Sequence, residues 1–166
     1  MTIYQDGDGS AYIIYASRDN FDMRIAKLAD DFLAVTADDK LLFSDHREAP
    51  AIFRYHRQYY LMTSACTGWK PNEINYYTST SPWGPWKKSD NNPLKGPGAE
   101  TTFGGQSTYV LPVRGKKDCF IFLADRWNPA NLTDSRYLWL PVQVKNGAPE
   151  IAWTDAWSLD FFDRGK

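Results

Sequence analysis

Three stretches of the chain repeat one pattern of hydrophobic and polar positions: a short apolar strand, a tight polar turn and a second strand rich in aromatic residues. They occupy residues 1–17, 47–64 and 105–125. From Tyr12 to Tyr60 is 48 residues, and from Tyr60 to Phe120 is 60. This period suits one four-stranded blade of a β-propeller with loop insertions. The pattern predicts an all-β fold in which the same antiparallel unit is repeated.

The first unit is expected within residues 1 to about 36. Asp6-Gly7-Asp8-Gly9 separates two apolar runs, and a polar turn of this kind between two strands is a strong hairpin signal. The same four residues could open a calcium loop, but the ligands that such a loop needs further along the chain are missing. We therefore predict a hairpin, followed by a strand at Met23–Leu28 and an edge strand at Phe32–Val35.

The second and third units are expected at residues 46–88 and 105–155. In the second unit the polar turn Tyr55–Gln58 joins two strands, and Pro82–Trp86 is predicted to close the unit. The strands of the third unit are predicted at Ser107–Val113, Cys119–Leu123, Tyr137–Val144 and Pro149–Trp153. Residues 89–105 are rich in Pro, Gly and Asn and lack periodicity, which predicts a long loop.

No stretch has a convincing helical period. We therefore expect residues 1–166 to form a single domain, a partial β-propeller with three blades. The composition agrees, because 166 residues with 43% hydrophobic content can bury a core and are too apolar for disorder.

Charge excludes two classes of partner. The 19 basic and 20 acidic residues give a formal net charge of -1, which supplies no electrostatic footprint for nucleic acid or for an anionic membrane. No run of about 18 apolar residues occurs, so no transmembrane helix is predicted.

Aromatic residues are abundant, with seven Trp, ten Tyr and nine Phe. They favour strands, and their flat apolar faces are surfaces on which pyranose rings stack. Most of them are expected to fill the interfaces between sheets. The two cysteines, Cys66 and Cys119, are interpreted as small buried side chains in preference to metal ligands or a disulfide. No metal or cofactor is predicted.

Two polar residues stand where a propeller places its chemistry. The innermost strand of each blade lines the central channel, so the residues that begin these strands meet at one mouth. Glu48 has this position in the second unit and Gln106 has it in the third. A partly desolvated carboxylic acid beside a sugar ring can protonate a departing glycosidic oxygen. Alternatively, Glu48 is a solvated residue that pairs with Arg47 at the start of its strand.

Several separate motifs follow one another along the chain: Arg47-Glu48-Ala49-Pro50, Ser64 to Trp69, Gly84-Pro85-Trp86, Thr101 to Thr108, Ala124 to Pro129, and Asp134 to Tyr137. Together they resemble glycoside hydrolase family 43, the five-bladed β-propeller glycosidases. Within that family they are most similar to the branch that contains exo-β-1,3-galactanases. The resemblance covers essentially the whole chain.

The resemblance implies roles for individual residues. Glu48 matches the general acid of the family, and Gln106 matches a channel residue that contacts the substrate or the attacking water. Thr67 and Trp69 fall in a loop that borders the sugar site in such enzymes, so they are expected to contact the substrate.

Three further charged residues are weaker candidates. Arg126 and Arg136 are proposed substrate contacts, although either could only brace the third unit by pairing with Asp125 or Asp134. Glu100 is a second carboxylate near the third unit, and we interpret it as a solvated loop residue.

The chain also departs from the family pattern. The residues Met1-Thr2-Ile3-Tyr4 resemble the middle of a family motif in which an Arg-Asp pair directly precedes the methionine, and that aspartate would tune the acid. Two blades, and with them the position of a base, would precede this point. The resemblance therefore implies a C-terminal fragment of a longer parent. The parent is expected to be secreted or periplasmic, and this chain opens with no signal peptide.

The function implied by the resemblance is hydrolysis of a plant-type polysaccharide such as β-1,3-galactan with inversion. Glu48 would protonate the leaving oxygen while water attacks the opposite ring face. One alternative is a related glycosidase acting on arabinan or xylan. The other is a non-catalytic or degenerate carbohydrate-binding fragment, because inversion needs a second group to hold the water and the Gln106 amide is a poor base.

The expected partner is an oligo- or polysaccharide, with neither nucleic acid nor membrane. Three blades of five would leave two blade faces exposed, which predicts self-association through those faces.

Overall fold

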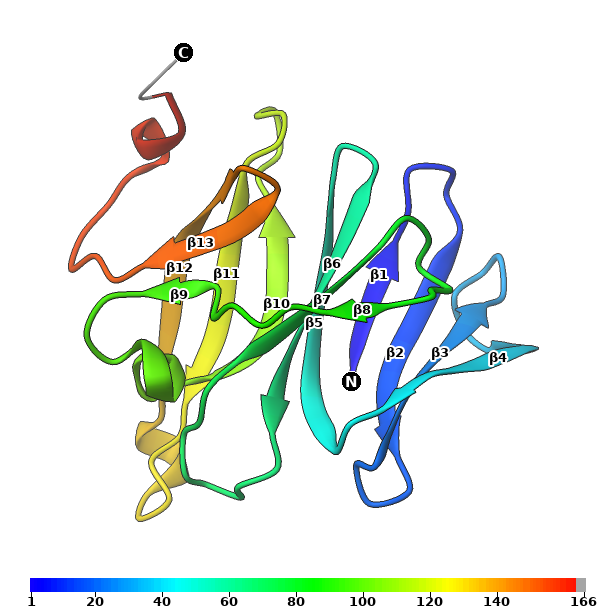
Figure 1. Ribbon diagram of the computed structural model, residues 1–166, viewed down its shortest axis with the longest axis horizontal. Coiled ribbons are helices and arrows are strands. Elements are labelled where there is room, and N and C mark those ends of the chain that lie inside the picture. Colours follow the sequence, from blue (N-terminus) through cyan, green and yellow to red (C-terminus); the bar gives the residue numbers. More distant parts are fainter. Residues whose placement is uncertain (164–166) are drawn as a thin grey trace.

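The computed structural model describes residues 1–163, which form three β-sheets lying side by side (Figure 1). Three short 3₁₀ helices lie outside the sheets: η1 (Ala99–Gly104), η2 (Leu132–Asp134) and η3 (Leu159–Asp163). The prediction of an all-β fold is confirmed. Over this described part of the chain, no helix has the length and apolar character needed to cross a membrane.

The first sheet contains β1 (Thr2–Gln5), β2 (Ala11–Ser17), β3 (Asp22–Leu28) and β4 (Val35–Ser44), in that order. The predicted hairpin between β1 and β2 is confirmed, with the Asp6 backbone N–H donating to Ser10 O at 2.8 Å. The predicted edge strand at Phe32–Val35 is wrong, because the fourth strand begins at Val35 and extends the sheet beyond residue 36. Strand β4 is mostly exposed and carries several charged side chains, so hydrophobic alternation did not reveal it.

The second sheet contains β5 (Arg47–Tyr55), β6 (Gln58–Ala65), β7 (Asn75–Ser79) and β8 (Lys87–Lys88), in that order. Tyr55 and Gln58 are paired, so the turn between β5 and β6 is shorter than predicted. The sheet closes with β8 and not with the segment Pro82–Trp86 that was predicted to close the unit. This segment forms the turn before β8, where the Trp86 indole N–H donates to Pro82 O at 3.2 Å.

The third sheet contains β10 (Gln106–Pro112), β11 (Phe120–Arg126), β12 (Arg136–Lys145) and β13 (Ala148–Ala152), with β9 (Leu94–Lys95) beside β13. Strand β9 runs parallel to β13 and belongs to the segment predicted as a loop. The loop prediction for residues 89–105 is therefore wrong at β9 and η1. A two-residue strand has no detectable period, and it is held by burial of Leu94 and by the bond from Ile151 N to Pro93 O at 2.9 Å.

Two layers of side chains join the three sheets, one on each face of the second sheet. Ile52 and Leu61 pack against β2 and β3 of the first sheet. On the opposite face, Phe53 and Tyr60 pack towards the third sheet, and the Phe53 ring centroid lies 4.9 Å from that of Phe120. The second sheet is thus covered on both faces. Because successive side chains of a strand point to opposite faces, nearly every position of its strands is buried and apolar.

The innermost strands of the three sheets are β1, β5 and β10, and β5 contacts both of the others. Sheets packed face to face with their first strands together are the arrangement of consecutive propeller blades. The first residues of β5 and β10 consequently lie at the same end of the molecule.

Candidate active site

Glu48 and Gln106 meet at one end of the innermost strands. Glu48 is the second residue of β5 and Gln106 is the first residue of β10. The Gln106 side-chain Nε2 donates a hydrogen bond to Glu48 Oε1 at 2.9 Å. The two residues that the sequence placed at a channel mouth are therefore in direct contact.

A β-bulge turns Glu48 towards this mouth. The pairing of β5 with β6 shifts between Glu48 and Ala51. Ala49, inside the bulge, has φ 50°, and its carbonyl accepts a hydrogen bond from Ser107 Oγ at 2.6 Å. Ser107 directly follows Gln106, so the third sheet holds the bulge in place.

The other carboxylate oxygen of Glu48 is held by the first sheet. Asn20 Nδ2 donates to Glu48 Oε2 at 2.9 Å from the turn between β2 and β3. Asn20 has φ 66°, a left-handed conformation that asparagine tolerates better than most residues. All three sheets therefore contribute to the surroundings of one carboxylate. None of the ion pairs among residues 1–163 includes Glu48.

Arg47 does not pair with Glu48, so the alternative of a local surface pair is wrong. Its guanidinium is buried, with the residue 8% exposed, and burial lowers its pKa. Arg47 donates to Thr63 Oγ1 at 3.1 Å, to Thr63 O at 2.6 Å and to Glu73 O at 3.2 Å. Neighbouring residues on a strand point to opposite faces, which separates the structural Arg47 from Glu48.

A cleft of about 730 Å³ opens beside Glu48, within the range of about 300–1,000 Å³ that ligand pockets occupy. Asn20, Glu48 and Gln106 form its polar end, and the open face of the first sheet forms most of the rest. Asp39 is a second carboxylate along this cleft, but it pairs with Arg24 and accepts a hydrogen bond from Tyr15.

Cys66 lies just after β6 and is partly exposed, unlike the buried Cys119. Its Sγ lies 3.5 Å from His46 O. Burial, together with the negative charge of nearby Glu48, raises the pKa of the Cys66 thiol. The interpretation of both cysteines as buried residues is therefore confirmed only for Cys119.

The loop after β6 brings one of its two predicted sugar contacts to the mouth. Trp69 is 53% exposed, and it lines a small crevice together with Trp127 and Gln106, the residue that donates to Glu48. The hydroxyl of Thr67 is used within the loop, since it donates to Lys70 O at 2.5 Å and accepts from Asn72 Nδ2 at 2.7 Å.

The two predicted arginines face each other across β11 and β12 but differ in their partners. Arg136 pairs with Asp134, which is the bracing alternative. Arg126 has no ion pair to Asp125 in the described residues, and its side chain lies close to Gly104, two residues before Gln106. Glu100 is exposed in η1, as expected for a solvated residue.

A model of glycosyl hydrolases family 43 matches residues 1–149. The chain belongs to this family. The comparison with curated protein sequences gives no match.

Solved structures of family 43 members superpose on nearly all of the chain. A GH43 β-1,3-galactosidase with galactodeoxynojirimycin has a TM-score of 0.91 and 49% identity, covering 96% of this chain and 46% of its own. A second GH43 β-1,3-galactosidase has a TM-score of 0.92 and 36% identity, covering 98% and 34%. The exo-β-1,3-galactanase from Phanerochaete chrysosporium with β-1,3-galactotriose has a TM-score of 0.80 and 32% identity, covering 90% and 34%.

The chain thus spans about a third to a half of the length of these relatives. Family 43 folds are five-bladed propellers, and the three sheets described above are three of those blades. The predicted family and the partial propeller are confirmed.

Sequence reasoning missed two residues of the mouth, Asn20 and Trp127. Asn20 lies in a turn, and nothing in the local sequence indicates that the turn reaches Glu48. Trp127 belongs to a motif that carried the family resemblance, but its indole contact with Gln106 depends on how the chain leaves β11.

Proposed function

We propose that the protein hydrolyses β-1,3-linked galactosides and that Glu48 is the general acid. The observation that supports this most is the position of the Glu48 carboxylate at the polar end of a large cleft. Two amide groups hold it, and it forms no ion pair with any residue that the structure describes. A carboxyl group in such a place can give its proton to a glycosidic oxygen. Membership of family 43 and the galactoside specificity named for its relatives support the choice of substrate.

In the proposed reaction, Glu48 protonates the leaving oxygen while water attacks the anomeric carbon from the opposite ring face, which inverts its configuration. Inverting enzymes hold the water with a second group, and the two groups lie about 6.5–9.5 Å apart. Gln106 is in direct contact with Glu48, which favours a role in contacting the sugar and holding the acid. Trp69 and Arg126 are proposed to border the sugar site, and Thr67 and Arg136 are weaker candidates because of their partners.

One observation favours non-catalytic sugar binding as a second candidate. The other carboxylate along the cleft, Asp39, is occupied by Arg24 and Tyr15, and these contacts hold the pKa of Asp39 below its usual value. It is therefore poorly suited to accept a proton from water. In this second reading the same mouth binds galactose without cleaving the linkage.

The test is the release of galactose from β-1,3-galactobiose, followed by proton NMR of the anomeric signals. It is run on two forms of the protein. One is this chain alone, and the other is a fusion of this chain with the part of the β-1,3-galactosidase that lies outside the superposed region. Release of the α-anomer first, by either form, is expected. Binding of the sugar without release by both forms would establish the second candidate, and preferential release of xylose or arabinose from their oligosaccharides would replace the substrate.

Because galactan is a polymer outside cells, we also propose that the protein acts as a secreted or periplasmic protein. The proposal predicts that the polypeptide is recovered from the culture medium or periplasmic extract of its host, and recovery only from the cytoplasm would contradict it.

A further inference from the structure

The side chain of Trp127 lies against the far end of the Gln106 amide. Its indole Nε1 donates to Gln106 Oε1 at 3.2 Å. At the other end of the amide, Gln106 Nε2 donates to Glu48 Oε1 at 2.9 Å and lies 3.4 Å from Ser64 Oγ. We infer that Trp127 is a positioning residue that fixes which way the Gln106 amide faces, an inference that rests on the proposed function of this mouth.

Donor and acceptor chemistry allows one amide orientation. An indole N–H only donates, an ionised carboxylate only accepts, and an amide has one end of each kind. A flipped Gln106 would place its NH₂ against the indole N–H of Trp127 and its carbonyl oxygen against Glu48. Both contacts would then be repulsive while Glu48 is ionised, so Trp127 and the Glu48 carboxylate select the same orientation from opposite ends. When Glu48 holds its proton, the Trp127 indole N–H alone selects this orientation.

The surroundings hold both partners in place. The Trp127 ring meets the Trp69 ring edge to face, with 5.5 Å between their centroids. On the backbone side, a Cβ on Gly105 would lie only 3.0 Å from Leu138 and 3.3 Å from Ala124. The absence of that side chain lets β10 start close against the neighbouring strands, which fixes the position of Gln106.

Loss of the indole N–H would leave the amide held at one end only. Glu48 alone would then select the orientation, and the amide would take both orientations whenever Glu48 holds the proton that it transfers. A sugar hydroxyl that meets this amide would find a donor in one state and an acceptor in the other. Since one neutral hydrogen bond contributes about a factor of five to ten, the expected loss in kcat/KM or in sugar affinity is about five- to tenfold.

The direct test follows the Gln106 side-chain amide by ¹⁵N NMR in Trp127→Phe, which keeps a ring but removes the N–H. Trp139→Phe is the matched control, because Trp139 is exposed on the same sheet and makes no side-chain contact with Gln106 in the described residues. The Gln106 amide signals are expected to shift or broaden in Trp127→Phe and to stay unchanged in Trp139→Phe. Unchanged signals in both variants would overturn the inference, whatever the activity.

A double-mutant cycle with Gln106→Ala separates positioning from general packing, with binding of galactodeoxynojirimycin as the readout. The five- to tenfold effect of Trp127→Phe is expected to vanish when Gln106 is already alanine. An effect of the same size in both backgrounds would show that Trp127 acts through packing or direct sugar contact. If no variant binds any sugar but the amide signals respond to Trp127→Phe alone, the proposed function fails and the positioning of Gln106 by Trp127 stands.

Discussion

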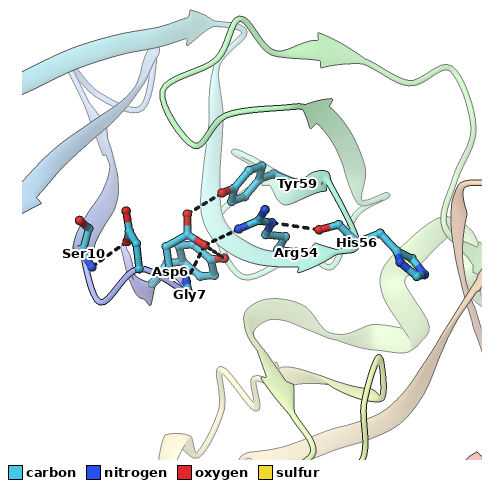
Figure 2. Close-up of polar contacts among 8 residues, drawn as sticks. Asp6, Gly7, Ser10, Arg54, His56 and Tyr59 are labelled. Carbon is cyan, nitrogen blue, oxygen red and sulfur yellow. Dashed lines mark hydrogen bonds and ion pairs between the residues drawn. The ribbon is translucent and has the colours of Figure 1, made fainter.

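Two carboxylates bridge neighbouring sheets at opposite ends of the innermost strands, and they are held in different ways. Asp6 follows β1 and accepts hydrogen bonds from the side chains of Arg54 and Tyr59 and from the backbone of Gly7 (Figure 2). The Tyr4 hydroxyl also donates to Asp6. Among the described residues, Glu48, near the start of β5, accepts hydrogen bonds only from two neutral amides, and it faces a large cleft. The first carboxylate has its acceptor sites filled within the protein, whereas the second keeps acceptor capacity for a ligand.

The two carboxylates also differ in their charged partners. Although burial acts to raise the pKa of the Asp6 carboxyl, hydrogen bonds from Tyr59, Gly7 and Arg54 hold it below its usual value. Arg54 also forms an ion pair with Asp6 at 3.0 Å. Burial, together with the Asp6 charge, raises the pKa values of both Tyr4 and Tyr59, which therefore stay protonated donors. The charge of Asp6 is thus compensated by Arg54, whereas Glu48 has no ion pair within residues 1–163.

The largest expected effect is on catalysis. In whichever form of the protein hydrolyses β-1,3-galactobiose, Glu48→Gln is expected to lower kcat by about 10²- to 10⁴-fold, because general acid catalysis is worth about that much. Glu100→Gln, at an exposed carboxylate in η1, is the control and should leave turnover unchanged. Unchanged turnover in Glu48→Gln would refute the assignment of the acid.

The reverse outcome is expected at the other end of the strands. Asp6→Asn removes the charge that Arg54 and two tyrosines share, and it should lower the free energy of unfolding by about 1–3 kcal/mol. Urea unfolding measures this loss, and sugar binding should not change. Asp8→Asn, on the same turn, is the control, and an equal loss there would show that turn chemistry and not the cluster is responsible.

A pH dependence follows from the lowered pKa of Asp6. A group whose folded-state pKa lies below its unfolded value contributes stability above the unfolded pKa, about 3.9 for Asp, and loses that contribution as the pH falls through the folded pKa. The stability gap between wild type and Asp6→Asn should therefore be constant from about pH 7 to pH 5 and shrink below about pH 4. Thermal unfolding of both proteins across this pH range measures the gap. A stability difference that grows as the pH falls below about 4 would contradict a lowered pKa of Asp6.

The smallest expected effect concerns association. The open faces of the outer sheets expose large apolar side chains, with Val35 59% exposed on the first sheet and Trp139 57% exposed on the third. We predict concentration-dependent self-association of the 166-residue chain in sedimentation velocity. Trp139→Lys should weaken it, since a charge on an apolar contact costs desolvation. A chain that stays monomeric at high concentration would contradict this prediction.

The sequence predicted the parts of the site that follow from strand position. Glu48 and Gln106 lie at the start of two inner strands, and the repeat of the unit places such residues at one mouth. The edge strand β4 and the two-residue β9 were not predictable from hydrophobic period, since one is exposed and the other is too short. Asn20 lies in the turn between β2 and β3, and Trp127 directly follows β11. Their contacts with Glu48 and Gln106 depend on the tertiary fold, so the local sequence does not predict them.

The most direct test of the difference between the two ends is a titration of the ¹⁵N-labelled chain with galactodeoxynojirimycin. The amide signals of Asn20, Glu48 and Gln106 are expected to move, while those of Asp6 and Arg54 stay in place. Shifts confined to the Asp6 end, or no shifts at saturating sugar analogue, would contradict the assignment of the Glu48 mouth as the sugar site.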